Sequence, residues 1–88
     1  MKYWYHDVGV LEQGKIVEIT LDATANVKIL DKENYDDYKN RRQYKSISTR
    51  ITSSPYAVKL PRTAHWFIVI ESDGQPGKIT SSVRVRSK

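Results

Sequence analysis

The chain has 88 residues, a length that fits one small domain with a single core. It contains no cysteine, which excludes disulfides, thiolate catalysis and cysteine-bound zinc or iron–sulfur sites. Residues 1–38 hold four basic and eight acidic side chains, whereas residues 39–88 hold eleven basic and two acidic ones. Such an excess of Lys and Arg can attract phosphate or acidic lipid, but charges scattered over both faces of a solvated sheet produce the same count.

Alternating apolar and polar residues predict a series of half-buried strands. The side chains expected to point inward are, in chain order, Val17, Ile19 and Leu21, then Val27 and Ile29, then Ile47 and Ile51, then Tyr56, Val58 and Leu60, and last Ile79, Ser81, Val83 and Val85. Residues 65–70, HWFIVI, are apolar on both faces, which predicts a central strand covered on both sides. Glycine and proline signals mark turns between these segments, the last of them over residues 73–77. Seven or so short strands predict an all-β fold, an antiparallel, jelly-roll-like β-sandwich forming a single domain over residues 1–88.

One short helix is expected near residues 32–40. Acidic residues precede basic ones along this stretch, the order that complements the helix macrodipole, and Asp31 is placed to cap the first turn. Tyr35 and Tyr38 are three residues apart and therefore share a face of the helix. We expect their rings to cover an open end of the sandwich.

A basic stretch begins at the end of the helix and is a candidate binding surface. Its residues are Lys39, Arg41, Arg42, Tyr44 and Lys45. Basic side chains interleaved with tyrosine can bind single-stranded nucleic acid through phosphate contacts and base stacking. Weak binding of single-stranded nucleic acid is therefore one hypothesis, and Arg84 and Arg86 would belong to the same surface if they share a face with this stretch. The alternative is that residues 39–45 are a solvated helical connection.

The two histidines, His6 and His65, are further candidates. A metal site would need a third ligand, such as Asp7 or Glu71, and a hydrolase triad would need a serine near His6 and Asp7, but no metal-binding or nucleophile motif is present. We expect instead that each histidine hydrogen-bonds the backbone at a strand end. The last candidate is Trp4, since alternation places it on one face and Tyr3 and Tyr5 on the other, which leaves aromatic rings exposed near an edge strand.

Four segments cover nearly the whole chain: HDVGVLEQGKIVEITL, ANVKILDKENYDDYK, SSPYAVKLPRTAHWFIVIE and SSVRV. Together they resemble a small bacterial family known only as domain of unknown function number eighteen eighty-three. The resemblance implies a β-sandwich domain that occurs alone or fused to TIR domains, and hence a sensing or interaction role. It implies no catalytic residues.

We therefore expect a non-enzymatic binding module without cofactor or metal, whose partner is a protein or a small ligand. A signal peptide and an apolar run long enough to span a membrane are not found, which predicts a cytoplasmic protein. We expect a monomer or a dimer paired through strand edges.

Overall fold

The computed structural model describes residues 3–71 and 79–87, and in these residues it contains seven strands and one helix. The elements are β1 (Tyr3–Leu11), β2 (Ile16–Leu21), β3 (Ala25–Asp31), α1 (Lys32–Lys39), β4 (Ile47–Ile51), β5 (Tyr56–Lys59), β6 (Ala64–Glu71) and β7 (Ser81–Arg86). The expected all-β fold and its short helix are confirmed. The turn expected over residues 73–77 lies outside the described residues.

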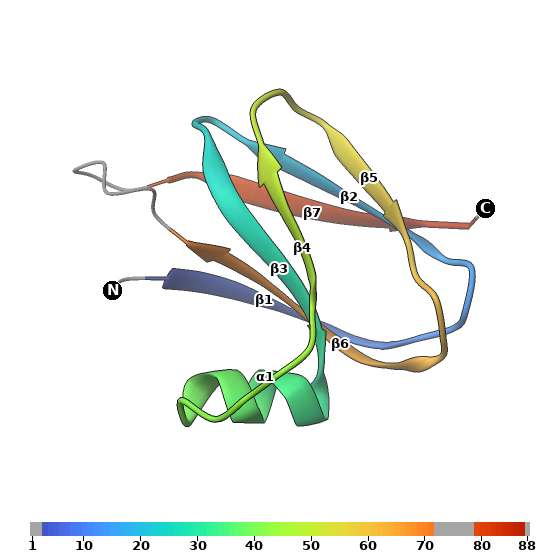
Figure 1. The fold of residues 1–88 in the computed structure, drawn as a ribbon. Coiled ribbons are helices and arrows are strands. Elements are labelled where there is room, and N and C mark those ends of the chain that lie inside the picture. The colour runs from blue at the N-terminus through green and yellow to red at the C-terminus, as the bar shows by residue number, and fades with distance from the viewer. Residues whose placement is uncertain (1–2, 72–78, 88) are drawn as a thin grey trace.

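The strands form two antiparallel sheets that face each other (Figure 1). One sheet has four strands in the order β1-β6-β3-β4, and the other has three in the order β5-β2-β7. The chain passes from one sheet to the other at every connection except that between β3 and β4, where α1 intervenes. This repeated crossing produces the predicted jelly-roll-like sandwich.

The main core lies between the two sheets and is built by the predicted alternation. Its fully buried side chains include Val17 and Ile19 from β2, Val27 from β3, and Ile68 and Ile70 from β6. Tyr56 and Val85 were expected inside as well but are 37% and 39% exposed. Both lie on the edge strands β5 and β7, opposite the buried Ile19 and Val17, so they point toward the core but remain beside its open margin.

The prediction for residues 65–70 is confirmed, because β6 lies between β1 and β3 and is buried on both faces. On its outer face, Phe67 and Val69 pack with Leu30 and Tyr35 in a second apolar cluster. The ring of Tyr35 stacks on that of Phe67 at a centroid distance of 4.2 Å. The helix therefore covers the outer face of the four-stranded sheet, not an end of the sandwich as we expected.

Candidate functional site

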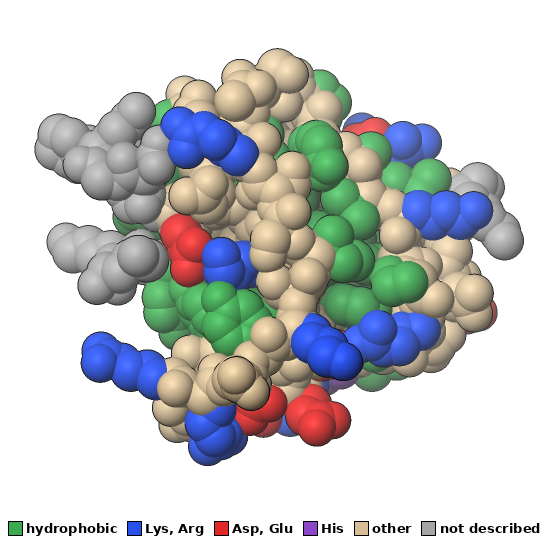
Figure 2. All heavy atoms as spheres, in the orientation of Figure 1, with side chains coloured by type: hydrophobic (Ala, Val, Ile, Leu, Met, Phe, Trp, Pro, Cys, Tyr) green, Lys and Arg blue, Asp and Glu red, His purple; other side chains and the backbone are tan. Residues whose placement is uncertain are grey.

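A groove runs along the start of β4 and past the connection between β5 and β6. It consists of two adjoining depressions, of about 180 and 820 Å3, that share Asp31, Asn34, Lys45 and Arg62. The smaller has an apolar floor of Ile29, Ile47 and Trp66, and the larger extends to Glu33, Gln43 and Tyr44. On this face of the molecule, Lys and Arg side chains lie beside acidic ones around the helix, and a band of hydrophobic side chains runs between β4 and β5 (Figure 2).

Arg62 is fixed on one side of this groove by three contacts. Its guanidinium pairs with Asp31 and lies over the Trp66 ring, 5.1 Å from the centroid. The indole Nε1 of Trp66 in turn donates to the Arg62 carbonyl at 3.2 Å. Since Trp66 is anchored in the core, these contacts hold Arg62 near the apolar floor.

Asp31 ends β3 and caps the helix, as predicted. Its Oδ1 accepts hydrogen bonds from the backbone N–H of Asn34 at 2.9 Å and from the Asn34 side-chain amide at 2.8 Å. Burial alone would raise the pKa of Asp31, but these hydrogen bonds and the pairing with Arg62 lower it below its ordinary value. Asp31 is thus a carboxylate whose charge is already compensated.

The opposite side of the groove is the segment that leads from α1 into β4. The Asn34 side-chain oxygen accepts the backbone N–H of Lys45 at 2.8 Å, and the Tyr44 ring packs edge-on against Tyr38 at 5.2 Å. No hydrogen bond or ion pair joins the Lys45 ammonium to another group in the described part of the chain. A cation without a counterion therefore lines the groove, beside a half-buried tyrosine.

The comparisons with known proteins give one positive result. A family model described as "Domain of unknown function (DUF1883)" matches residues 1–88. The chain belongs to this family. Neither a curated protein nor a solved structure matches it.

In this DUF1883 domain, the other predicted basic residues lie outside the groove. Lys39 is 3.7 Å from Asp36 and lies over the Tyr35 ring, and Arg42 pairs with Asp37 at 2.9 Å. Arg41 is exposed in a left-handed backbone conformation, with φ of 59°. Of the basic stretch, the structure brings only Tyr44 and Lys45 to the groove.

Arg84 and Arg86 do not share a face with this stretch. Both belong to β7 in the three-stranded sheet, where Arg84 pairs in register with Glu18 and Arg86 forms an ion pair with Glu18 at 2.8 Å. Glu18 alternates with the buried Val17 and Ile19, so these charges are on the outside of that sheet. The helix and the basic stretch cover the other sheet, and the larger nucleic-acid surface that would combine both groups is not formed.

Each histidine of the DUF1883 domain bonds a side chain, not the strand-end backbone that we expected. The His6 Nε2 lies 2.9 Å from the Ser81 hydroxyl, joining β1 to β7, and burial lowers the pKa of His6. The His65 Nε2 lies 2.6 Å from Asp7 Oδ1, and its ring stacks on Phe67. The hydrogen bond from His65 lowers the pKa of Asp7, and the backbone N–H of Gly9 contributes in the same direction.

These pairs separate the members of the triad considered above. Successive residues of a strand point to opposite faces, so His6 reaches Ser81 on the inner side while Asp7 reaches His65 on the outer side. Among the described residues, no group of three metal-ligating side chains is close enough to hold an ion. Nor is any helix of the described part long and apolar enough to cross a membrane.

Trp4 packs against the core between the sheets, and Tyr5 is the exposed aromatic residue of β1, at 55%. An aromatic ring is thus exposed on this edge strand, but it is the ring of Tyr5 and not that of the candidate Trp4.

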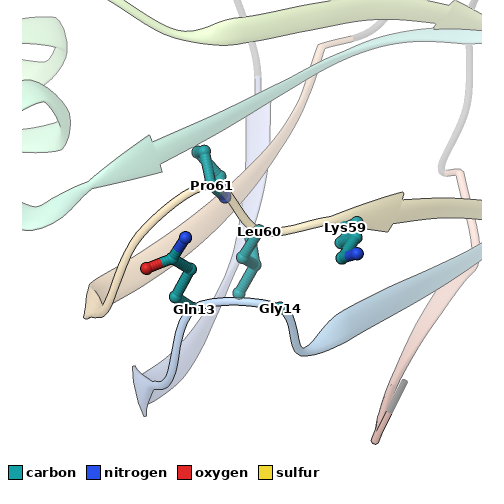
Figure 3. A pocket seen from close by; sticks show the side chains of 5 residues that line it. All are labelled: Gln13, Gly14, Lys59, Leu60 and Pro61. Atoms are coloured by element: carbon teal, nitrogen blue, oxygen red, sulfur yellow. The ribbon is translucent and has the colours of Figure 1, made fainter.

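A further depression of about 440 Å3 lies where the β1–β2 turn meets the end of β5 (Figure 3). Its lining is Gln13, Gly14, Lys59, Leu60 and Pro61. Backbone hydrogen bonds from the Gly14 N–H to the Leu60 carbonyl and from the Leu60 N–H to the Lys15 carbonyl join the turn to the end of β5 at this place.

Sequence reasoning missed Arg62, Asn34 and Trp66 as residues of the groove. Trp66 belongs to the strand predicted to be covered on both sides and is 2% exposed, and it borders the groove beneath the Arg62 guanidinium. The signal that could have found Arg62 is its position four residues before Trp66 and directly after Pro61, in a short connection that must pass the helix start. Nothing in the sequence indicates that this connection meets residues 43–45.

Proposed function

We propose that this DUF1883 domain is a non-enzymatic binding module that recognises its ligand in the groove between residues 43–47 and Arg62. The observation that carries the proposal is the Lys45 ammonium, which has no counterion in the described part of the chain and lies beside a floor of Ile29, Ile47 and Trp66. Binding sites typically combine an apolar lining with a few polar groups that orient the ligand. The groove has both features.

The chemistry of the groove favours an anionic group attached to an apolar body. A carboxylate or phosphate would contact the Lys45 ammonium and the guanidinium N–H groups of Arg62 that Asp31 does not use, since Arg has five such donors. The apolar body would lie on the half-buried Ile47 side chain, because Ile29 and Trp66 are only 1% and 2% exposed. Asp31 opposes such a ligand little, because Arg62 already compensates its charge, and Glu33 lines the larger depression but not the one with the apolar floor.

An amide NMR titration with two matched small molecules tests the proposal. The first is indole-3-acetate and the second is its uncharged amide. We expect the carboxylate to shift the amide signals of residues 43–47 and 62–66, with a dissociation constant at least about tenfold lower than that of the amide, equivalent to about 1.4 kcal/mol. Equal binding of both compounds, or shifts that avoid these residues, would contradict the proposal.

Lys45→Ala provides the matched variant, and Arg41→Ala is its control. Both positions are exposed cations on the same connection, but Arg41 does not line the groove. We expect Lys45→Ala to weaken carboxylate binding about tenfold, as removal of a hydrogen bond to a charged group does, and Arg41→Ala to leave it unchanged. A similar loss in both variants would indicate general charge attraction instead of a site.

The cellular role that we propose is partner recognition in a bacterial, TIR-linked signalling system within the cytoplasm. Its support is the sequence resemblance described above and the groove that the described residues form. Capture of a TIR protein by the wild-type domain, and loss of capture in Lys45→Ala, is the expected result. If the pure protein converted a substrate, and this activity disappeared on substitution of His6 or His65, the domain would be an enzyme and the proposal of a binding module would be wrong.

The same NMR titration, with an oligonucleotide as the ligand, tests the alternative hypothesis that the domain binds single-stranded nucleic acid. A short mixed-sequence single strand would be added at low and at near-physiological salt. Shifts that cluster over residues 39–45 and persist at the higher salt would favour the nucleic-acid hypothesis, because non-specific charge attraction weakens steeply with salt. We expect the shifts to disappear, since Lys39 and Arg42 are already paired with carboxylates of the helix and Tyr44 packs against Tyr38.

A further inference from the structure

The edges of the two sheets differ in how they are protected against pairing with another chain. Among the described strands, the edges are β1, β4, β5 and β7. Lys or Arg on an edge strand is a usual protection. Strand β4 carries Arg50, β5 carries Lys59, and β7 carries Arg84 and Arg86. Strand β1, with the sequence YWYHDVGVL, has neither a basic residue with a long side chain nor a proline.

Apolar side chains are also exposed along β1. Tyr5 is 55% exposed and Val10 is 71% exposed. Tyr5 packs on Tyr35 and Phe67, and Val10 pairs in register with His65, whose ring stacks on Phe67. Both exposed side chains therefore lie on the outer face of the four-stranded sheet, next to its open edge.

We propose that β1 of one chain pairs with β1 of a second copy, antiparallel and centred on Tyr5, so that two four-stranded sheets become one continuous sheet. The paired segment is Tyr3–Asp7, because the register shift between Asp7 and Gly9 interrupts the regular edge beyond it. This inference goes beyond the proposed function. The groove lies by β4, at the other edge of the sheet, and stays open in the dimer.

The charges of Tyr3–Asp7 are compatible with pairing to the same segment of a second copy. Pairing about Tyr5 places Tyr3 opposite Asp7 and Trp4 opposite His6, so the carboxylates of the two copies do not meet. The two Tyr5 rings become direct cross-strand neighbours, a favourable aromatic pair. The same operation on β7, centred on Val85, would bring Arg84 against Arg86 of the second copy, which like-charge repulsion disfavours.

Sedimentation of the wild-type chain over a concentration series is the first test. We expect the mass to rise with concentration from 10.2 kDa toward twice that value. Tyr5→Lys adds the missing edge charge and should keep the protein a monomer, whereas Tyr56→Lys, at another exposed edge tyrosine, should dimerise like the wild type. A wild-type chain that remains a monomer up to about 1 mM overturns the proposal.

Cysteine cross-linking tests the register and does not depend on the Tyr5→Lys variant. The chain has no cysteine, so a single introduced thiol can form a disulfide only with a second copy. Directly opposed residues of antiparallel strands have Cα atoms about 4.5–5.5 Å apart, within the range that a disulfide spans. We expect Tyr5→Cys to cross-link at least about tenfold faster than Tyr56→Cys, because pairing raises the local thiol concentration. Equal rates in the two variants would contradict pairing through β1.

Discussion

The phenol of Tyr38 donates a hydrogen bond of 2.6 Å to Oε2 of Glu71, across the outer face of the four-stranded sheet. The other oxygen of Glu71 accepts from the Lys28 ammonium at 3.0 Å, and Glu71 itself is only 8% exposed. Burial raises the pKa of Tyr38, and the hydrogen bond to Glu71 adds to this. The helix is thus attached to the sheet through a nearly buried carboxylate.

Removal of this bond is expected to destabilise the domain. Tyr38→Phe keeps the ring but leaves one Glu71 oxygen without its donor, which we expect to lower the free energy of unfolding by about 1–3 kcal/mol. Chemical denaturation monitored by tryptophan fluorescence measures this change in the free energy of unfolding. Tyr44→Phe is the control, because no hydrogen bond of the Tyr44 hydroxyl is found within the described residues, and it should change stability by less than about 0.5 kcal/mol.

Asp31→Ala removes the N-cap of α1 together with the pairing partner of Arg62. We expect a loss of about 1–2 kcal/mol, the upper part of the range for N-cap substitutions. Asp31→Asn retains an oxygen acceptor for the helix N–H groups but not the charge, so it separates capping from pairing. Urea unfolding of both variants checks this, and an Asn variant as unstable as the Ala variant would show that the pairing dominates.

The ion pair between Asp31 and Arg62 also makes the free energy of unfolding depend on pH under acidic conditions. Because the folded pKa of Asp31 lies below its unfolded value, the stabilisation is present above the unfolded pKa and is lost as pH falls through the folded one. The wild type should therefore lose stability in acid more steeply than Asp31→Ala. Denaturation midpoints of both proteins between about pH 6 and pH 2 provide the comparison.

His6 should titrate below the ordinary value of 6.5, because burial disfavours the imidazolium. The unfolded chain then binds the proton more readily, so stability is complete above the unfolded pKa and decreases as pH falls through it toward the folded pKa. Carbon-resolved NMR of the two imidazoles measures the pKa directly. A His6 pKa above 6.5 would contradict the prediction, and His6→Gln should reduce the dependence of stability on pH in this window.

Gly9 has φ of +76°, and a Cβ built on it would meet no atom within 4 Å. Gly9→Ala therefore tests backbone strain without a steric clash. We expect a loss of about 1–2 kcal/mol, the cost of a left-handed conformation for a residue with a side chain. Gly9→Asn should lose less, because Asn tolerates this region better. Thermal unfolding distinguishes the two variants.

The strands, their faces and the helix with its Asp31 cap could be predicted from local patterns, because each depends on residues within a few positions of one another, and the number of strands then indicated a sandwich. Lys45 and Arg62 illustrate what could not be predicted. They are 17 positions apart, and they line the same groove only because β3 continues into α1 and the chain returns past its start. Similarly, Asp7 and His65 both looked significant, but their pairing depends on the register of β1 with β6, which no local pattern specifies.

The strand order also constrains when the fold can form. Among the described strands, β1 has β6 as its sheet neighbour, and β2 pairs with β5 and β7. The first two strands therefore cannot pair until segments from the second half of the chain are present. Only β3 and β4 can pair early, across the helix. Topologies dominated by such distant pairings fold slowly. During synthesis on the ribosome, β1 would thus emerge well before β6 is made and would stay unpaired until then.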